Sequence, residues 1–387
     1  MRDHVTTSPT TFDPDSIDCD GFFKELRAIR LEVEAALGEE DIRHLERLER
    51  VGRAATCVGV ATAWVPNPLS MAALALGRST RWLLMHHVGH RGYDRVPGVP
   101  PRYTSRVFAT GWRRLVDWPD WMLPEAWKYE HNVLHHTHTG ELRDPDLIER
   151  NAESLRDANL PQVVKLAGIG FLALTWRSFY YAPNTVKAWL ERGQEAPRGA
   201  RMPRGYTRTL WLRGYLPYAV LQFGALPALF LPLGPLAVGS AFVNSLGAEA
   251  LTNLHTFLVV GPNHTGDDLY RFDGRPRSKA ESAVRQVLGS ANYATGGDLV
   301  DYAHLWLNYQ IEHHLFPDLP MLRYREIKPK VEALCAKYDI PYVQEGVFAR
   351  AKKMVAIAVG RASMKRAVEI GKARTMPAQR EARHADC

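Results

Sequence analysis

The sequence has few cysteines, and none of them forms a CxxC pair. Cys19, Cys57, Cys335 and Cys387 are scattered over 387 residues. This spacing suggests neither a disulfide framework nor a thiolate metal site, and a reducing compartment is the simplest interpretation. The sequence also lacks the HExxH motif of zinc peptidases and any row of Asp and Glu typical of a carboxylate-bridged helical bundle.

The amino-terminal segment lacks the apolar core of a cleavable signal peptide, because residues 1–20 are polar and acidic. The formal net charge of the chain is +7. Its basic residues lie beside apolar runs and do not form one continuous basic stripe. This distribution favours contact with anionic lipid headgroups, and no nucleic-acid partner is expected.

Apolar residues are concentrated in two regions that predict helical hairpins in a membrane. Residues 51–85 hold two short apolar arms around a VPNP turn, although a buried hairpin of a soluble protein would have the same pattern. Residues 210–260 form the stronger hairpin, with only Arg213 and Glu249 charged. Residues 160–181 are amphipathic and are expected to lie in the interface, because a fifth span would place the histidine clusters on opposite sides.

The predicted fold is therefore an all-α integral membrane protein with two transmembrane hairpins, about four spans, interfacial helices and a cytosolic helical cap. Residues 1–50 are expected to form cytosolic amphipathic helices, residues 51–325 the membrane domain, and residues 326–387 a basic, solvated helical tail. A bacterial inner membrane with the site on its cytoplasmic side is expected. The arginines that indicate this side by the positive-inside rule are Arg78, Arg81, Arg192, Arg198, Arg201, Arg204 and Arg208.

Histidines are gathered into four short windows. The chain has fifteen, of which twelve lie in HHVGH, HNVLHHTH, LHTFLVVGPNH and HLWLNYQIEHH. A lone histidine is usually a hydrogen-bonded core or surface residue, but twelve beside the ends of apolar segments indicate a metal site. His86 and His90 share one helix face, His131 and His135 repeat that spacing, and His136 points toward a second position.

The fourth window adds an amide and two imidazoles on one helical turn, from Gln310, His313 and His314. Glu312 is expected to point away from them. Imidazole suits zinc, copper, iron or nickel, so the ligand type alone does not identify the metal. A single zinc ion needs three or four ligands, and nine or more candidates therefore imply two ions.

The order HHVGH, HNVLHH, QIEHHLFP resembles the three histidine boxes of the membrane fatty acid desaturase family. Gln310 and the HLFP that follows are similar to the subgroup of front-end acyl desaturases and bacterial acyl-lipid relatives. The DPDL at 144–147 and the DYAHLWLNYQ before the third box also resemble the family, so that the likeness covers roughly residues 50–325. The resemblance implies two iron ions held by His86, His90, His131, His135, His136, His264, Gln310, His313 and His314.

Several further residues have roles that the resemblance leaves open. His255 competes with His264 for the ligand near the end of the last apolar segment. His87 stands where the family often has an acidic residue. It either donates a hydrogen bond to a ligand or indicates that the first histidine box binds its metal differently from the rest of the family. Expected to orient imidazoles without binding metal are His138, His304 and Asn132.

The family's reaction implies activation of dioxygen and removal of two hydrogens from adjacent methylenes of a lipid acyl chain. The sequence has no HPGG haem-binding motif, so electrons are expected from a separate ferredoxin or cytochrome that docks on the basic face. The same scaffold could instead hydroxylate or ketolate a sphingoid or carotenoid lipid. A metal-dependent membrane hydrolase and a metal transporter are more distant alternatives.

Overall fold

The computed structural model describes residues 16–193 and 202–367, and most of them are helical, as predicted. The described residues also contain four short strands, which the sequence did not predict. β1 (Tyr270–Phe272) pairs in parallel with β4 (Lys365–Ala367), and β2 (Ala291–Asn292) with β3 (Val343–Gln344). These two pairs fasten the carboxy-terminal segment to the rest of the chain.

The first helix, α1 (Cys19–Ala35), packs with α15 (Lys279–Leu288) and α18 (Leu322–Lys337) at one end of the molecule. Together with α17 (Gln310–Leu315), which contacts α15 and α18, these helices form an assembly that we call the cap. In α1 the Asp18 carboxylate accepts the Gly21 N–H at 2.8 Å, which satisfies one free donor of the first turn. α2 (Glu39–Ala61) then runs as one helix through residue 50, where the domain boundary was expected.

The first predicted hairpin consists of α2 and α3 (Pro68–Gly89), which contact each other closely. Asn67 ends the turn between them, because its side chain accepts the Ser70 N–H at 2.7 Å and Pro68 opens the helix. α3 also packs along α14 (Pro235–Val260). The carboxy-terminal end of α3 carries His86 into the cap.

Among the described residues, one helix is long and apolar enough to cross a membrane, the continuous segment Tyr206–Leu233. It alternates between α and π turns. Pro217 and Pro227 each lack an N–H, which removes an α-helical hydrogen bond and favours the wider π turns before them. Its parts are α11 (Tyr206–Arg208), η6 (Thr209–Tyr215), α12 (Leu216–Ala219), η7 (Val220–Ala225), α13 (Leu226–Ala228) and η8 (Leu231–Leu233).

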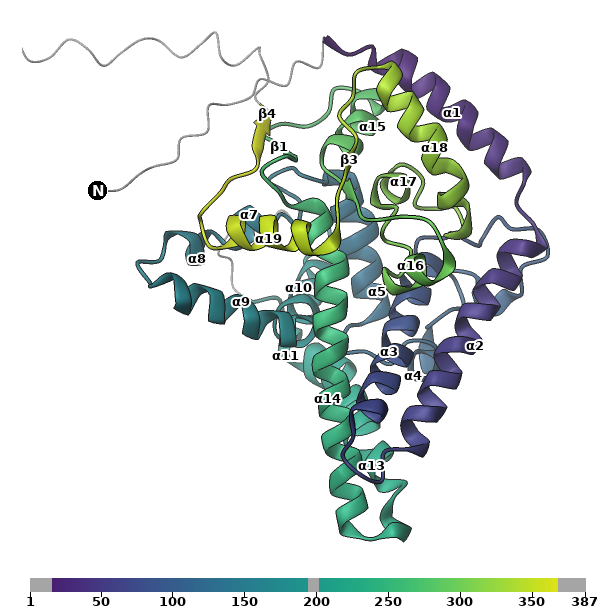
Figure 1. The fold of residues 1–387 in the computed structure, drawn as a ribbon, viewed down its shortest axis with the longest axis vertical. Helices are drawn as coiled ribbons and strands as arrows, with labels where there is room; N and C mark the ends of the chain where they lie inside the picture. The colour runs from purple at the N-terminus through teal and green to yellow at the C-terminus, as the bar shows by residue number, and fades with distance from the viewer. Residues whose placement is uncertain (1–15, 194–201, 368–387) are drawn as a thin grey trace, which may run out of the picture.

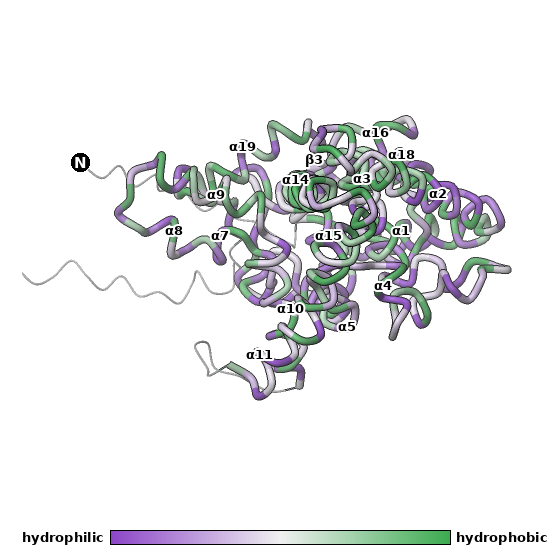
Figure 2. The backbone as a smooth tube through the Cα atoms, turned by 90° about the horizontal axis from the view of Figure 1, so that it is seen from below, coloured by the Kyte–Doolittle hydropathy of each residue, from purple (hydrophilic) through white to green (hydrophobic). Residues whose placement is uncertain are grey.

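Figure 1 shows α2, α3 and α14 converging toward the end of the molecule at α13, with the cap at the opposite end. α9 (Gln162–Trp176) lies across the direction of α14. α19 (Val347–Ala358) contacts both α9 and α14. Viewed along the long axis, α9 extends to one side of the paired α3 and α14, and α2 to the other (Figure 2). The remaining helices are η2 (Pro101–Tyr103), η3 (Gly111–Arg113), α4 (Arg114–Asp117), α5 (Pro124–Trp127), η4 (Lys128–His135), α6 (His136–His138), α7 (Ile148–Asn151), α8 (Glu153–Asp157), η5 (Arg177–Tyr181), α10 (Ala182–Leu190), η9 (Pro262–His264) and α16 (Asp298–Ala303).

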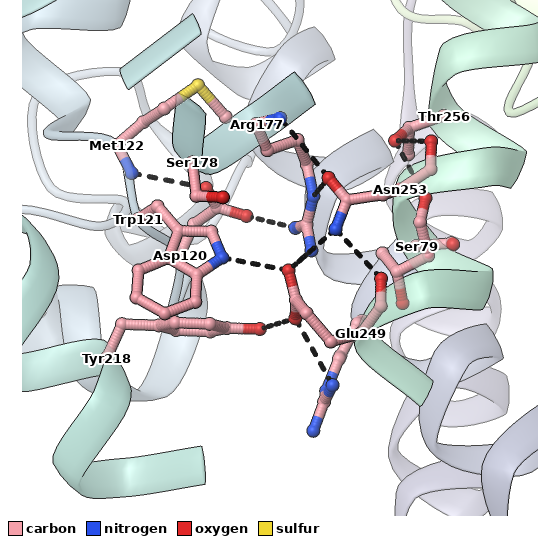
Figure 3. Close-up of polar contacts among 12 residues, drawn as sticks. Ser79, Asp120, Trp121, Met122, Arg177, Ser178, Tyr218, Glu249, Asn253 and Thr256 are labelled. Atoms are coloured by element: carbon pink, nitrogen blue, oxygen red, sulfur yellow. Dashed lines mark hydrogen bonds and ion pairs between the residues drawn. The ribbon is translucent and has the colours of Figure 1, made fainter. Parts of the chain in front are cut away.

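Charged residues inside the helix bundle pair with one another. Glu249 of α14 forms an ion pair with Arg78 of α3. Glu249 also pairs with Arg177, which in turn pairs with Asp120 (Figure 3). Arg78 therefore does not mark a cytoplasmic flank as predicted, because its guanidinium is buried against α14. A charge leaves water at high cost, and only an opposite charge with further hydrogen bonds offsets that cost.

The basic residues of the carboxy-terminal segment are partly paired. Lys353 of α19 lies 2.9 Å from both Asp268 and Glu345, and Arg366 lies 2.7 Å from Asp273. Arg198 and Arg201, and the basic residues beyond 367, lie outside the described residues. α19 therefore rests on the cap through ion pairs and is not a freely solvated helix.

Candidate metal centre

The four histidine windows meet in the cap. His86 and His90 lie at the carboxy-terminal end of α3. His131 and His135 lie on the π-helix η4, and His136 follows at the start of α6. The remaining predicted ligands lie on η9 and α17, and they are His264, Gln310, His313 and His314.

One group of potential ligands consists of His86, His90, His131 and His313. All four side chains are buried, and each can offer a ring nitrogen within 4.8 Å of the others. His86 Nε2 and His313 Nε2 are 3.0 Å apart. Two nitrogens bound to one metal ion at about 2.1 Å would be separated by roughly 3 to 3.5 Å, so this group has the dimensions of a metal site.

A second group lies beside the first and consists of His135, His136 and His314. The rings of His136 and His314 are stacked with their centroids 4.2 Å apart. The His264 ring lies 4.4 Å from that of His314 and 4.8 Å from that of His135. The Gln310 amide nitrogen is 2.7 Å from His264 Nε2, so His264 and Gln310 complete this second group.

His255, the competitor of His264, points elsewhere. Its Nδ1 is 3.0 Å from Ser79 Oγ and its Nε2 is 2.7 Å from the Ala303 carbonyl oxygen. Both ring nitrogens therefore have partners away from the two groups. His264 therefore lies with the second group, whereas His255 joins α14 to α3 and to the end of α16.

The second histidine window does not adopt the regular α-helix that the four-residue spacing suggested. In η4 the His136 N–H donates to the carbonyl of His131, five residues earlier. The wider turn changes how successive side chains project, and π-helical turns of this kind are frequent at functional sites. His131 lies in the first group and His135 and His136 lie in the second, while His131 and His135 also form a third set of potential ligands with Asp146.

Most of the buried imidazoles are suited to bind metal because burial lowers their pKa values and leaves several ring nitrogens without a hydrogen bond. Burial lowers the pKa of His264 to about 4 and lowers the pKa of His314 well below its usual value. A buried nitrogen without a partner costs free energy, and coordination to a metal ion would remove that cost. Among the described residues, the nitrogens without a hydrogen-bond partner include His90 Nε2, His131 Nε2, His314 Nε2 and both ring nitrogens of His136.

Two carboxylates of the DPDL segment lie behind the histidines, and sequence reasoning gave them no role. Asp144 accepts from His135 Nδ1 at 2.8 Å and from the Gly140 N–H at 2.8 Å. Burial alone would lower the pKa of His135, but the Asp144 carboxylate raises it above its usual value. This bond fixes the tautomer and turns His135 Nε2 toward the second group. Asp146 Oδ2 lies 3.7 Å from His135 Nδ1 and 3.9 Å from His131 Nδ1.

Other ligand candidates are oriented by polar residues far away in sequence. Tyr324 Oη lies 3.2 Å from His313 Nδ1, and Gln286 Oε1 accepts from His314 Nδ1 at 2.8 Å. Tyr181 Oη is 3.5 Å from His131 Nδ1. No sequence motif points to these three residues, because only the fold brings them to the histidines.

The residues expected to orient imidazoles mostly contact backbone. His87 lies 3.3 Å from the Leu305 carbonyl oxygen, and His304 lies 2.8 Å from that of Val300. Asn132 donates to the Gly89 carbonyl at 2.9 Å and so ties the second histidine window to the first. His138 lies 3.4 Å from Glu141. As predicted, Glu312 points away, and it accepts from Asn292 and Tyr342.

Changing Asp144 to asparagine is expected to weaken metal binding by ~10- to 100-fold, because the amide holds His135 less firmly in its tautomer. The apparent affinity should be measured by competition with a chelator. Asp117→Asn is the matched control, since Asp117 is also buried, pairs with Arg113 and accepts a backbone N–H, but away from the histidines. Equal affinities in both variants would contradict this role of Asp144.

An apolar cavity of about 290 Å³ reaches the histidines. Its walls come from α9, α14, α19 and the α7–α8 segment, with side chains such as Leu155, Ile169, Phe257 and Met354. At its inner end the lining includes His86, His131, His135, His264 and Gln310. An apolar ligand in this cavity would therefore lie directly against both groups.

Comparisons with known proteins agree on one family. Residues 62–346 match the family model described as fatty acid desaturase. A NADPH-dependent stearoyl-CoA 9-desaturase of Mycobacterium tuberculosis is 27% identical over 350 residues, which cover 84% of this chain and 75% of the relative. The chloroplastic acyl-lipid (7-3)-desaturase of Chlamydomonas reinhardtii is 28% identical over 78% of this chain and 58% of its own length. An acyl-lipid (8-3)-desaturase of Physcomitrium patens is 26% identical over 57% of this chain and 47% of its own length.

Proposed function

Because this chain belongs to the fatty acid desaturase family, we propose that it introduces a double bond into a lipid acyl chain with dioxygen at two histidine-bound iron ions. The observation that carries the proposal is the meeting of two groups of buried imidazoles with an apolar cavity. An unreactive hydrocarbon needs a strong oxidant held in a dry site. The imidazoles would hold the metal ions that supply the oxidant, and the apolar lining would keep water out.

The residues of the two groups divide the metal binding between them. His86, His90, His131 and His313 would hold one ion, and His135, His136, His264 and His314 with Gln310 would hold the other. When bound, the two irons would supply the activation of dioxygen. Asp144, Gln286 and Tyr324 keep the imidazoles in their binding orientation, since each contacts the ring nitrogen Nδ1 of one candidate ligand.

The apolar lining positions the substrate without acting on it chemically. Side chains such as Ile169, Phe257 and Met354 exclude water and hold methylenes against the histidines. Removal of two hydrogens and reduction of dioxygen to water also requires two electrons. We assign their supply to a separate ferredoxin or cytochrome, which would dock on the cap.

A membrane would cover the apolar side chains that the fold leaves exposed. Leu236 of α14 is 87% exposed and Val163 of α9 is 71% exposed, and Phe171 is also exposed. We infer that α2–α3 and the pair formed by Tyr206–Leu233 with α14 span the bilayer as two hairpins. α9 would lie in the interface, and the cap would face the cytoplasm of a bacterial cell.

The test is expression in a host of defined lipid composition, followed by gas chromatography and mass spectrometry of the fatty acids. Desaturation predicts products lighter than a host fatty acid by two hydrogens, formed only with oxygen. The same scaffold acting as a hydroxylase would instead give products heavier by one oxygen atom. Lipid conversion that continues without oxygen would overturn both and favour a hydrolase.

A further inference from the structure

Aromatic rings bound the cavity where it reaches the histidines. The Trp176 ring lines the cavity and lies 5.2 Å from the ring of Tyr181 and 6.5 Å from that of Trp82, measured between centroids. The Trp82 ring in turn lies 5.5 Å from His86. Trp176 and His86 both line the cavity, so the size of the indole limits the space for an acyl chain beside the first group of imidazoles.

Hydrogen bonds to α14 hold Trp176 in this position. Its Nε1 donates to the Asn253 carbonyl at 2.9 Å and lies 3.2 Å from Thr256 Oγ1. The next residue, Arg177, uses its backbone N–H and its Nε to contact Asn253 Oδ1 at 3.2 and 3.3 Å (Figure 3). α9 ends and the π-helix η5 begins at this point, a change of helix type that often marks functional positions.

The ion-pair network around Glu249 holds Asn253, the residue whose carbonyl accepts the Trp176 N–H. Glu249 accepts from Asn253 Nδ2 at 2.9 Å, Trp121 Nε1 at 2.8 Å and Tyr218 Oη at 2.5 Å, in addition to its pairs with arginines. Figure 3 shows these donors converging on the one carboxylate. This network fixes Asn253 and Arg177, the residues beside the indole. A shift of the indole would leave its buried N–H without its bond to the Asn253 carbonyl, which is costly.

We propose that Trp176 determines which pair of methylenes lies beside the histidines, and hence the position of the double bond. This inference rests on the proposed function. A saturated chain offers many chemically similar methylenes, and an apolar cavity makes nearly the same contacts with each of them. A bulky side chain held at a fixed place in the lining can select one position, and the Trp176 indole is hydrogen-bonded to α14 in that way.

The test compares the double-bond positions made by the wild-type protein and by Trp176→Leu, located by mass spectrometry of derivatised fatty acids. Each methylene of a pocket is worth roughly 10- to 200-fold in discrimination. We therefore expect the ratio of displaced to original isomer to rise roughly tenfold or more. The iron content should stay unchanged, because Trp176 is not a ligand. The same isomer ratio as in the wild type would overturn the proposal.

Trp118→Leu is the matched control, because Trp118 is also buried but does not line the cavity. It should lower product yield at most and leave the isomer ratio unchanged. Trp176→Phe keeps an aromatic ring but loses the N–H bond to α14. If Trp176→Leu fails to fold, the isomer ratio of Trp176→Phe tests the proposal in its place. An unchanged isomer ratio would then overturn the proposal. A wild-type protein that makes no unsaturated product would instead refute the proposed function.

Discussion

Replacing His313 with alanine is expected to lower iron binding and desaturation by more than ~100-fold, since even residues that only orient ligands contribute 10- to 100-fold. His313 Nε2 lies 3.0 Å from His86 Nε2, and its ring lies 4.8 Å from that of His90 and 5.0 Å from that of His136. Its imidazole therefore lies between the two groups. The iron-to-protein ratio and the amount of unsaturated product measure the effect.

His304→Ala is the control for this experiment, because it removes a histidine of the same window. His304 Nδ1 contacts the Val300 carbonyl, and its ring packs on Tyr293. The iron content of this variant should match that of the wild type. A His313→Ala protein that keeps its iron and its activity would contradict the assignment of the first group.

The second large effect separates two histidines that compete for one ligand position in the sequence, where His264 is preferred to His255. His264→Ala is expected to lose iron and activity to a similar extent, because its ring lies within 4.4 Å of His314 and its Nε2 meets Gln310. His255→Ala should keep its iron, since His255 contacts Ser79 and Ala303. Both variants should be purified in parallel and analysed for metal and for products.

The reverse outcome, iron loss in His255→Ala with normal iron in His264→Ala, would mean that α14 turns differently around its axis. Loss in both variants with an unchanged melting temperature would place both residues near the metal. Since His255 also joins α14 to α3, thermal unfolding of each variant in detergent is the necessary companion measurement.

Sequence reasoning succeeded where the signal is local. Two apolar arms around the VPNP turn predict the hairpin of α2 and α3. The clustering of the histidines predicts that the windows meet, although the full ligand set rests on the family resemblance. Sequence reasoning failed where long-range contacts decide. The π turns of η4, which carry His131 and His135, are not indicated by the spacing of the histidines, which fits a regular α-helix equally well.

Buried charge was the other source of error. Arg78 was assigned to a membrane flank from its sign and position alone, but it pairs with Glu249 on a helix far away in sequence. Buried polar residues also lower the mean hydropathy of α14. α14 carries Asn244, Glu249 and Asn253, all of them buried, and these polar side chains dilute an otherwise apolar helix. Composition therefore identifies Tyr206–Leu233 more readily than α14.

The account depends on the histidines of four distant segments binding two metal ions at the end of one apolar cavity. The most direct test is elemental analysis of the purified full-length protein, with Mössbauer spectroscopy of iron-57-enriched material. We predict about two iron ions per chain in an environment dominated by nitrogen ligands. A protein that is active on lipids but contains no iron, or only one tightly bound zinc ion, would contradict the account.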